Sequence, residues 1–253
     1  MKLSPRQQQV LQWVQREGFA AIEHLAESFA VTPQTVRRDI NELCSLGLLR
    51  RYHGGAGLPS SVENIAYQAR QDLYLEEKRR IAALLAEHLP NQASLFINLG
   101  TTNEEVARAL LGHRGLRVIT NNLNVANILC GNNDFQILIT GGMVRHRDRG
   151  ITGEAAVDFI RKFRVDFGIL GISGIDRDGT LLDFDYQEVR VAEAMIANSR
   201  QVLMAADHSK FTRTPMVRLA HLSQVDAFFT DRPVPPEMIP VFREAETEVL
   251  VAR

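Results

Sequence analysis

The chain has 253 residues, of which 45% are hydrophobic and 23% charged, and its 29 Lys and Arg nearly balance its 30 Asp and Glu. This length and apolar content allow one large domain or two unequal ones, and they exclude a disordered or collagen-like chain. No apolar run of membrane-spanning length and no secretory signal occur, so we expect a cytoplasmic protein with no membrane partner. The two cysteines, Cys44 and Cys130, match no metal-binding spacing, and we expect no disulfide, metal or cofactor.

Charge is distributed unevenly along the chain. Residues 1–57 hold a small excess of Lys and Arg, whereas the remainder holds a small excess of Asp and Glu. The net charge of residues 1–57 is too small to indicate nucleic-acid binding. Whether this segment binds nucleic acid must be judged from the positions of its charged residues.

Two helices are predicted at the start of the chain. Ser4 supplies an N-cap and Pro5 suits the first helical position, while Gly18 ends the same helix. Apolar residues spaced at three and four positions between residues 22 and 29 predict a second, shorter helix. The chain therefore begins with two short amphipathic helices.

A third helix follows, with a polar outer face. Thr32 and Pro33 open it by the same cap-then-proline signal, and Val36, Ile40 and Leu43 form its apolar stripe. At 100° per residue, the side facing away from this stripe is basic and rich in amides. The residues on that side are Gln34, Arg37, Arg38 and Asn41. Asp39 lies between the two faces and is expected to orient an arginine or cap a neighbour.

A basic hairpin completes a DNA-binding pattern. Residues 48–56 predict two short strands around a Gly54-Gly55 turn, so residues 1–57 are expected to form a mostly α winged helix-turn-helix domain. Arginine and amide side chains match base edges in the major groove, while hydroxyls, backbone amides and wing cations match phosphate. The expected DNA-binding residues are Thr32, Gln34, Thr35, Arg37, Arg38, Asn41, Arg50, Arg51 and His53. A merely solvated helix face and an adaptor that contacts proteins remain as alternatives.

The rest of the chain predicts a linker and an α/β domain. Residues 58–75 lack a sustained apolar period and are expected to be a linker, helical at most in part. In residues 76–253, apolar runs alternate with helical stretches, which is typical of a mostly parallel sheet covered on both faces. The expected strands are 94–99, 116–120, 135–140, 165–172, 201–205, 226–230 and 247–251. The expected helices are 76–89, 104–111, 123–130, 154–163, 186–199 and 236–245.

One strand-to-helix turn has the composition of a phosphate site. Gly100, Thr101 and Thr102 combine a flexible backbone, two hydroxyls and a helix N-terminus, which together can bind a phosphate. Glu104 and Glu105 would repel an anion unless they point away. An ordinary connection between strand and helix explains the same residues equally well.

Polar residues follow other expected strands too. The carboxyl ends of parallel strands meet at one edge of a sheet, so these distant residues are expected to converge around a ligand. The further candidates are Asn121, Gly142, Arg145, Gly171, Asp176, Asp207 and Lys210. Their cations suit phosphate and their Asp and Asn side chains suit hydroxyls, as in a small phosphorylated polyol. Singly, Gly142 is equally explained as a turn, Arg145 as a solvated loop residue, Asp207 as a helix cap and Lys210 as a surface charge.

The sequence resembles the deoxyribose-operon repressor (DeoR) family of bacterial regulators. Arg6, Val10 and Val14, followed by residues 32–43, match the helix-turn-helix signature of that family, and residues 52–56 extend the match. The similarity continues over nearly the whole second domain, including residues 120–127 and 166–176. It implies a repressor of glycerol metabolism genes that binds double-stranded operator DNA and is released by glycerol 3-phosphate. Symmetric regulators of this type are expected to be homodimers or homotetramers.

The same resemblance implies a fold for the effector and oligomerisation domain, which is expected over residues 76–253. Effector domains of this family are similar to ribose-5-phosphate isomerase, which implies that Gly100–Thr102 form the phosphate loop. Asp176, Glu188 and Lys210 then correspond to residues that face the ligand. The glycine-rich segment that follows the catalytic acids of the isomerases is missing after Asp176, so we expect no enzymatic activity. The alternative is an isomerase-like enzyme carrying an accessory DNA-binding domain.

Overall fold

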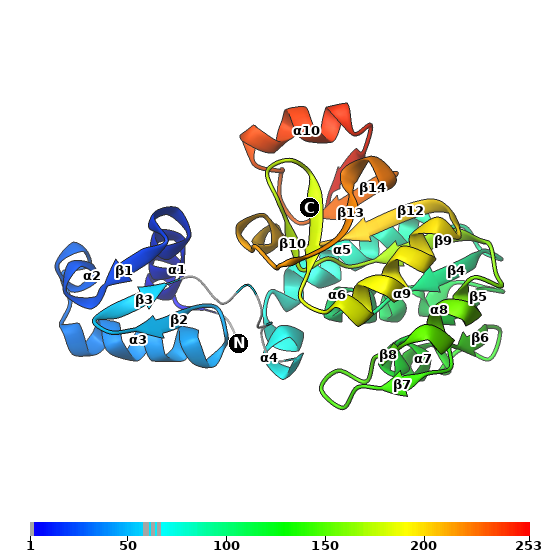
Figure 1. Cartoon of the computed structure of the whole chain (residues 1–253), viewed down its shortest axis with the longest axis horizontal. Helices are drawn as coiled ribbons and strands as arrows, with labels where there is room; N and C mark the ends of the chain where they lie inside the picture. Colours follow the sequence, from blue (N-terminus) through cyan, green and yellow to red (C-terminus); the bar gives the residue numbers. More distant parts are fainter. Residues whose placement is uncertain (1–2, 58–60, 62–63, 65–66) are drawn as a thin grey trace. The chain divides into compact units, whose positions relative to one another are not determined.

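The computed structural model describes residues 3–57, 61, 64 and 67–253. The chain divides into two compact units, with the division between Leu73 and Tyr74 (Figure 1). The expected linker, 58–75, lies partly outside the described residues, and its described part contains helix α4 (Tyr67–Asp72). Every helix in the described part of the chain is too short or too polar to cross a membrane.

The three helices predicted for the N-terminal unit are confirmed. They are α1 (Pro5–Glu17), α2 (Ile22–Ser28) and α3 (Pro33–Ser45). The Ser4 hydroxyl accepts from the Gln7 amide and the Gln7 side chain accepts from the Ser4 amide, which completes a capping box. Gly18 ends α1 in the left-handed conformation, at φ 77°. The local capping signals alone therefore place these helix ends.

A small antiparallel sheet follows the helices, with strand order β1-β3-β2. Its strands are β1 (Phe19–Ala21), β2 (Arg50–Tyr52) and β3 (Gly55–Gly57). The prediction of a two-stranded hairpin was incomplete, because three residues are too few for β1 to show a period in the sequence. The turn was also misplaced, since Gly55 belongs to β3. A Cβ on Gly55 would lie 2.3 Å from the Ala20 carbonyl oxygen, so only glycine allows this close pairing.

The C-terminal unit is built on a seven-stranded sheet in the order β15-β14-β12-β9-β4-β5-β6. All its neighbouring strands run parallel, which confirms the predicted sheet. The strands are β4 (Ser94–Ile97), β5 (Arg117–Thr120), β6 (Gln136–Ile139), β9 (Val165–Leu170), β12 (Ser199–Ala205), β14 (Ala227–Thr230) and β15 (Glu248–Val251). Each strand begins at its predicted first residue or one residue later, apart from β12, which begins two residues before the predicted start.

Helices cover both faces of this sheet (Figure 1). Leu95 and Ile97 pack in one core with α5 (Leu75–His88), α6 (Thr101–Ala109) and α7 (Leu123–Leu129). Phe96 points to the opposite core, which contains α8 (Glu154–Ile160), α9 (Tyr186–Ala197) and α10 (Ile239–Glu244). This alternation along one strand explains why the buried strands are apolar at successive positions.

Two predicted helix boundaries were wrong in ways that matter. Helix α6 begins at Thr101 rather than at residue 104, so both threonines of the expected phosphate loop stand in its first turn. The stretch 236–245 is divided between a 3-10 turn (Pro236–Met238) and α10, because Pro240 favours a new helical start. Helix α5 begins at Leu75, the last residue of the expected linker.

Five short strands of the C-terminal unit were not predicted. A hairpin joins β7 (Met143–Val144) to β8 (Ile151–Thr152), and a second small sheet contains β10 (Gly174–Ile175), β11 (Thr180–Asp183) and β13 (Val217–His221). Their lengths of two to five residues give too little sequence for a periodic signal.

The strand order reverses between β4 and β9. From β4 the chain continues outward to β5 and β6, whereas from β9 it continues in the opposite direction to β12, β14 and β15. Connections that diverge from two adjacent parallel strands leave a space beyond their carboxyl ends, and ligands of open α/β sheets bind there. The topology therefore directs attention to the residues that follow β4 and β9.

Candidate DNA-binding surface and effector site

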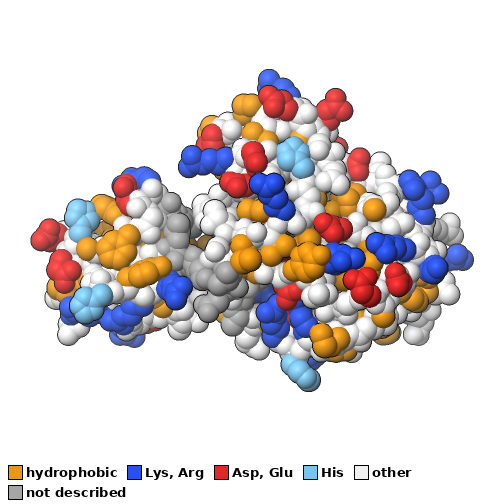
Figure 2. Space-filling view, in the orientation of Figure 1, with side chains coloured by type: hydrophobic (Ala, Val, Ile, Leu, Met, Phe, Trp, Pro, Cys, Tyr) orange, Lys and Arg blue, Asp and Glu red, His pale blue; other side chains and the backbone are white. Residues whose placement is uncertain are grey.

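The polar face of α3 forms the candidate DNA-binding surface. Gln34, Arg38 and Asn41 are exposed and Arg37 is half-buried, while Val36, Ile40 and Leu43 are fully buried beneath them. Neighbouring side chains restrain two of the arginines: the Arg37 guanidinium donates to Gln34 Oε1 at 3.3 Å, and Arg38 donates to Glu42 Oε1 at 3.2 Å. Figure 2 shows basic side chains along the edge of this unit where Figure 1 places α3.

The ends of this surface are held by short-range contacts. At the start of α3, the hydroxyls of Thr32 and Thr35 lie 2.9 Å apart, and the Thr35 amide donates to the Thr32 hydroxyl. On the hairpin, Arg51 donates to the Asn41 side chain, so one wing arginine is tied to the helix. Arg50 and His53 are exposed on the same hairpin. The structure thus places the nine expected DNA-binding residues at the N-cap of α3, along α3 and on the hairpin of one unit.

An ion pair joins α3 to α1. Asp39 is buried and accepts hydrogen bonds from Arg6 at 2.5 and 3.3 Å, which raises the pKa of the Arg6 guanidinium. One turn further along α3, the Gln7 amide donates to Glu42 at 2.5 Å. The expectation that Asp39 orients an arginine is confirmed, and the arginine is the one on α1. The role of Gln7 across the interface was not predicted, because a capping residue carries no signal for a second partner.

In the C-terminal unit, the turn after β4 meets the turn after β9. A Cβ on Gly171 would lie 3.6 Å from both Asn103 Nδ2 and the Leu99 carbonyl oxygen, so the backbone of Gly171 lies beside the start of α6. Asn103 is fully buried and donates to the carbonyls of Asn98 and Leu99, at 3.1 and 3.0 Å. The structure therefore brings Gly100, Thr101 and Thr102 close to Gly171, as the topology requires.

Buried polar atoms occur along the carboxyl edge of the sheet. Within the described residues, six such atoms there have no hydrogen-bond partner: Oδ1 of Asn98, Asn103 and Asn121, Nδ2 of Asn122, and Oγ1 of Thr140 and Thr230. They follow or end β4, β5, β6 and β14. Leaving a buried polar atom without a partner costs about 1 to 3 kcal/mol, so this edge favours a polar ligand or bound water.

The two glutamates of α6 are held by neighbours. Glu104 is buried and accepts from Asn124 Nδ2 at 3.0 Å. Glu105 lies 3.5 Å from the Arg79 guanidinium and 3.7 Å from that of Arg108. The two arginines offset the charge of Glu105, so the repulsion of an anion that the sequence suggested is reduced for Glu105, whereas Glu104 keeps its charge beside a neutral amide.

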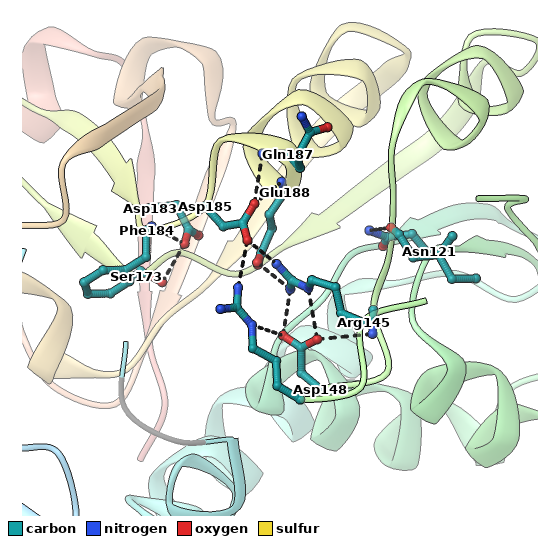
Figure 3. Close-up of polar contacts among 12 residues, drawn as sticks. Asn121, Arg145, Asp148, Ser173, Asp183, Phe184, Asp185, Gln187 and Glu188 are labelled. Carbon is teal, nitrogen blue, oxygen red and sulfur yellow. Dashed lines mark hydrogen bonds and ion pairs between the residues drawn. The ribbon is translucent and has the colours of Figure 1, made fainter. Parts of the chain in front are cut away.

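Arg145 lies at the centre of an acidic cluster (Figure 3). Its guanidinium contacts Asp148 at 2.7 Å, Asp185 at 2.9 Å and Glu188 at 2.7 Å. Burial disfavours the charged form, but these carboxylates outweigh it and raise the pKa of Arg145. The alternative of a solvated loop residue is wrong, because only 12% of this side chain is exposed. Arg145 is thus neutralised from three sides.

Glu188 is the carboxyl group of this cluster that is least easily ionised. Burial, together with the nearby Asp183, raises the pKa of Glu188 to about 7 against the opposing effect of Arg145. Asp183 accepts from the Ser173 hydroxyl at 3.1 Å, so the chain after β9 joins the same network. Asp148, Asp183 and Asp185 were not predicted as site residues. Asp185 followed by Glu188 at three positions is a helix-start signal that marks this place in the sequence.

A second charged cluster follows β12. Asp207 caps a 3-10 turn (η2, His208–Thr212) by accepting from the Ser209 amide at 3.0 Å, which confirms it as a cap. Lys210 Nζ lies 3.5 Å from Asp207 and its side chain is only 15% exposed, so it is more than a surface charge. Burial opposes ionisation of Asp207, but Lys210, Ser209 and the buried Lys78 of α5 together lower its pKa.

Two candidates are not brought to these clusters by any contact in the described structure. Asp176 is exposed and lies at the turn between β10 and β11, where it accepts from the Arg177 amide. Gly142 lies between β6 and β7 at φ 136°, and a Cβ there would approach the Thr152 carbonyl oxygen to 2.6 Å. Its turn geometry explains the glycine without a ligand. Asn121 is buried and donates to the Ile151 carbonyl at 3.3 Å, which leaves its Oδ1 at the sheet edge.

No group of three His, Cys, Asp or Glu side chains suited to a metal ion occurs among residues whose positions are described. Cys44 and Cys130 are free thiols, and burial raises the pKa of Cys44. The chemistry available at the sheet edge therefore consists of hydroxyls, amides, carboxylates, Lys210 and the backbone of α6.

Comparison with known proteins covers both units. The model of the DeoR-like helix-turn-helix domain matches residues 6–62, and that of the DeoR C terminal sensor domain matches residues 74–232. Part of the chain resembles the solved structure of ribose 5 phosphate isomerase A from Neisseria gonorrhoeae, with a TM-score of 0.40 and 14% identity over 57% of this chain and 55% of that one.

Two curated relatives match almost end to end. The glycerol-3-phosphate regulon repressor of Escherichia coli K12 is 52% identical over 96% of this chain and 97% of its own length. The protein of the same name from Haemophilus influenzae is 51% identical over 99% of this chain and 98% of its own length. With both units matched and relatives of this similarity, the chain belongs to the DeoR family of helix-turn-helix proteins.

Proposed function

We propose that this protein is a sequence-specific repressor of glycerol metabolism genes whose operator affinity falls when glycerol 3-phosphate binds the C-terminal unit. The two relatives named as glycerol-3-phosphate regulon repressors support this choice of regulon and ligand. One observation carries the proposal: the chain contains both a DNA-type surface and a ligand-type site. Helix α3 exposes arginine and amide side chains, and the carboxyl edge of the sheet holds buried amide atoms without hydrogen-bond partners.

In this proposal α3 reads the operator from the major groove. Arg37, Arg38, Gln34 and Asn41 supply donors and acceptors to base edges, and Thr32 and Thr35 contact phosphate at the start of the helix. Arg50, Arg51 and His53 add phosphate or minor-groove contacts from the hairpin. The Arg6–Asp39 ion pair keeps α3 at a fixed angle to α1 while it does so.

The effector is proposed to bind at the switch point between β4 and β9. Gly100, Thr101 and Thr102 receive the phosphate at the first turn of α6, with Gly171 leaving room beside them. Lys210 supplies a cation, while Asn121, Asp207 and Glu188 suit the hydroxyls. Arg145 is bound by three carboxylates, so it orders Glu188 and leaves phosphate binding to α6 and Lys210. Asp176 and Gly142 are the weakest members of the proposed set, because the contacts described above hold them elsewhere.

One observation favours the enzymatic alternative. A glutamate with a pKa near 7 is suited to general acid–base catalysis of a sugar phosphate. Glu188 Oε2 already accepts a hydrogen bond from Arg145 at 2.7 Å, however, so this oxygen is engaged within the cluster. The relatives reported above are repressors, and the isomerase resemblance is limited to the fold.

The proposed repressor acts in the cytoplasm as a homodimer or homotetramer. Two copies of α3 would occupy half-sites about 34 to 36 Å apart, one turn of the DNA helix. A single unit with so few basic residues makes few phosphate contacts, so a second copy increases affinity by adding as many again.

Titration of operator binding tests this function directly. Affinity for operator DNA is measured without ligand and with saturating glycerol 3-phosphate, glucose 6-phosphate or inorganic phosphate at one fixed salt concentration. We expect glycerol 3-phosphate to weaken specific binding by about 5- to 150-fold, the usual range for coupled sites, and the others to have little effect. An unchanged affinity with every ligand, or turnover of a phosphorylated sugar, would contradict the proposal.

A further inference from the structure

The first residue of the C-terminal unit has a strained backbone. Tyr74 follows the division after Leu73 and stands as the N-cap of α5 at φ 55° and ψ 36°, in the left-handed region. A bulky side chain disfavours this region, and such a residue keeps it only when its surroundings hold it there. Tyr74 therefore depends on its contacts for its conformation.

The Tyr74 ring contacts the loop after β12. Its ring meets the ring of His208 edge to face, with centroids 4.8 Å apart. His208 is itself fixed by Asp231, because the His208 amide donates to Asp231 Oδ1 at 2.8 Å and the ring Nδ1 lies 2.7 Å from Oδ2. The Tyr74 ring thus rests on a histidine that both carboxylate oxygens of Asp231 hold in place.

The same loop carries two of the proposed effector residues. Asp207 precedes His208 and Lys210 follows it by two, and both lie in or next to η2. Lys78, one turn after Tyr74 on α5, is buried and stabilises the charged form of Asp207. The Lys78 amide donates to the Tyr74 carbonyl at 3.0 Å. Residues 207–210 are therefore linked to the start of α5 twice, by a ring contact and by charge.

We infer that Tyr74 is a hinge that transmits effector binding to the DNA-binding unit. Binding at Asp207 and Lys210 shifts η2 and withdraws His208 from the Tyr74 ring. Without that contact, Tyr74 leaves the left-handed region for the extended one that its side chain prefers. The direction in which the preceding residue, Leu73, enters α5 then changes, and the affinity of the DNA-binding unit for its operator falls.

This mechanism supplies the two-state element that ligand-controlled binding needs. A ligand shifts an equilibrium only by the difference in its affinity for the two states, so some part of the molecule must have two discrete arrangements. A tyrosine balanced between two backbone regions is such a part. The inference rests on the proposed function, because it assigns the step between effector site and operator affinity.

Replacing Tyr74 tests the hinge. Tyr74→Gly removes the ring and allows the left-handed backbone freely, so it breaks the link between η2 and the chain before α5. Tyr74→Phe keeps the ring contact and serves as the conservative variant. Gln92→Gly is the matched control, because Gln92 is another left-handed residue, at φ 61°, in the turn that follows α5. Thermal unfolding of each variant establishes that it is folded.

Three quantities are measured on each protein: operator affinity without ligand, glycerol 3-phosphate affinity by calorimetry, and operator affinity at saturating glycerol 3-phosphate. We expect wild type, Tyr74→Phe and Gln92→Gly to lose about 5- to 150-fold in operator affinity on adding ligand, and Tyr74→Gly to lose about twofold or less while still binding both partners. Operator DNA should correspondingly fail to weaken ligand binding in Tyr74→Gly, because coupling is reciprocal.

A Tyr74→Gly protein that responds as strongly as wild type overturns the hinge while leaving the repressor function intact. Loss of response in Tyr74→Phe overturns it as well, because that variant keeps the ring contact. If wild type itself does not respond to any phosphorylated ligand, the proposed function fails instead. A second variant, His208→Ala, should reproduce the uncoupling of Tyr74→Gly from the other side of the contact, and a normal response from it counts against the inference.

Discussion

The two units present their candidate binding residues in opposite ways. In the N-terminal unit, Gln34, Arg38 and Asn41 are exposed on α3, and the apolar residues of the same helix lie beneath them. In the C-terminal unit, Asn103 and Asn121 are fully buried at the end of a sheet. A surface that meets a macromolecule needs exposed side chains, whereas a small ligand is enclosed by groups already withdrawn from water.

The two units also differ in how their buried charges are paired. In the N-terminal unit, the ion pair between α1 and α3 joins one arginine to one carboxylate, Arg6 to Asp39, and Arg6 stays 37% exposed. In the C-terminal unit, Arg145 is surrounded by three carboxylates and is 12% exposed. The acidic cluster thus holds more charged groups away from water than the Arg6–Asp39 pair does. Removing its arginine should therefore cost more stability than removing Arg6. The variants below test this difference, from the largest expected effect to the smallest.

Arg145→Ala should destabilise the protein most. It leaves Asp148, Asp185 and Glu188 without their shared cation in a region largely closed to water, and removing one partner of a buried pair costs about 3 to 5 kcal/mol. Urea unfolding of the C-terminal unit measures the loss. Arg147→Ala is the control, because its side chain is 59% exposed and pairs with the same Asp185, so its loss should stay below about 1 kcal/mol. Equal losses in the two variants would show that burial of Arg145 contributes nothing.

This difference between units also explains which features the sequence predicts. A helix with caps and one apolar stripe is determined by neighbours in the chain, so α1, α3 and the polar face of α3 are predictable from residues 4–45. The seven core strands are predictable because each is a run of apolar residues. The surroundings of Arg145 are not, because Asp185 and Glu188 lie about 40 positions further along the chain and only the fold brings them together.

Some missed residues left a signal in the sequence. Lys78 stands at i, i+3, i+4 and i+7 spacing with Ile81, Ala82 and Leu85, and a lysine on an apolar helix stripe indicates a buried charge with a partner. Tyr74 left none, because its left-handed backbone depends on a ring contact with a residue more than 130 positions away. The short strands β7, β8 and β10 likewise gave no period, and their positions follow from pairing alone.

Arg37→Ala should weaken operator binding by about 1 to 3 kcal/mol, the range for a base-reading contact, with a smaller loss on random DNA. Its half-buried position beside Gln34 favours a fixed geometry over a mobile phosphate contact. Fluorescence anisotropy with both DNA sequences at one salt concentration measures the two losses. Arg16→Ala, which removes an exposed arginine from α1, is the matched control and should change neither. Equal losses on operator and random DNA would reassign Arg37 to phosphate.

Lys210→Ala should leave operator binding intact and reduce the response to glycerol 3-phosphate. A hydrogen bond to a charged group contributes about 1.5 to 3 kcal/mol, so ligand affinity should fall by about tenfold or more. Calorimetry measures that affinity, and operator binding at increasing ligand concentrations measures the response. Lys162→Ala, at an exposed position after α8, removes an equivalent charge as the control. A normal ligand response in Lys210→Ala would remove this lysine from the effector site. The buried charge of the C-terminal unit would then not mark its ligand-binding residues.

The smallest expected effect is a pH dependence that arises from Glu188. Burial and Asp183 raise its pKa to about 7, from an ordinary value of 4.5, so between these two pH values the folded protein binds a proton that the unfolded chain releases. The stability contributed by that proton is complete below pH 4.5 and is lost as the pH rises through 7. Asp185 has a lowered pKa, which keeps it ionised throughout this range, so it adds no slope of its own there.

Glu188→Gln should therefore flatten the pH dependence of the unfolding free energy between pH 5 and 8. One pKa unit corresponds to about 1.4 kcal/mol, and screening at this partly exposed carboxyl reduces the full shift to a change of about 1 to 2 kcal/mol. Urea unfolding at pH 5, 6, 7 and 8 measures the slope in both proteins. Glu193→Gln, at an exposed position of the same helix α9, serves as control and should keep the wild-type slope. Equal slopes of unfolding free energy against pH for wild type and Glu188→Gln would mean that Arg145 keeps Glu188 ionised from pH 5 to 8. Glu188 would then be a permanently charged partner of Arg145, as Asp39 is of Arg6.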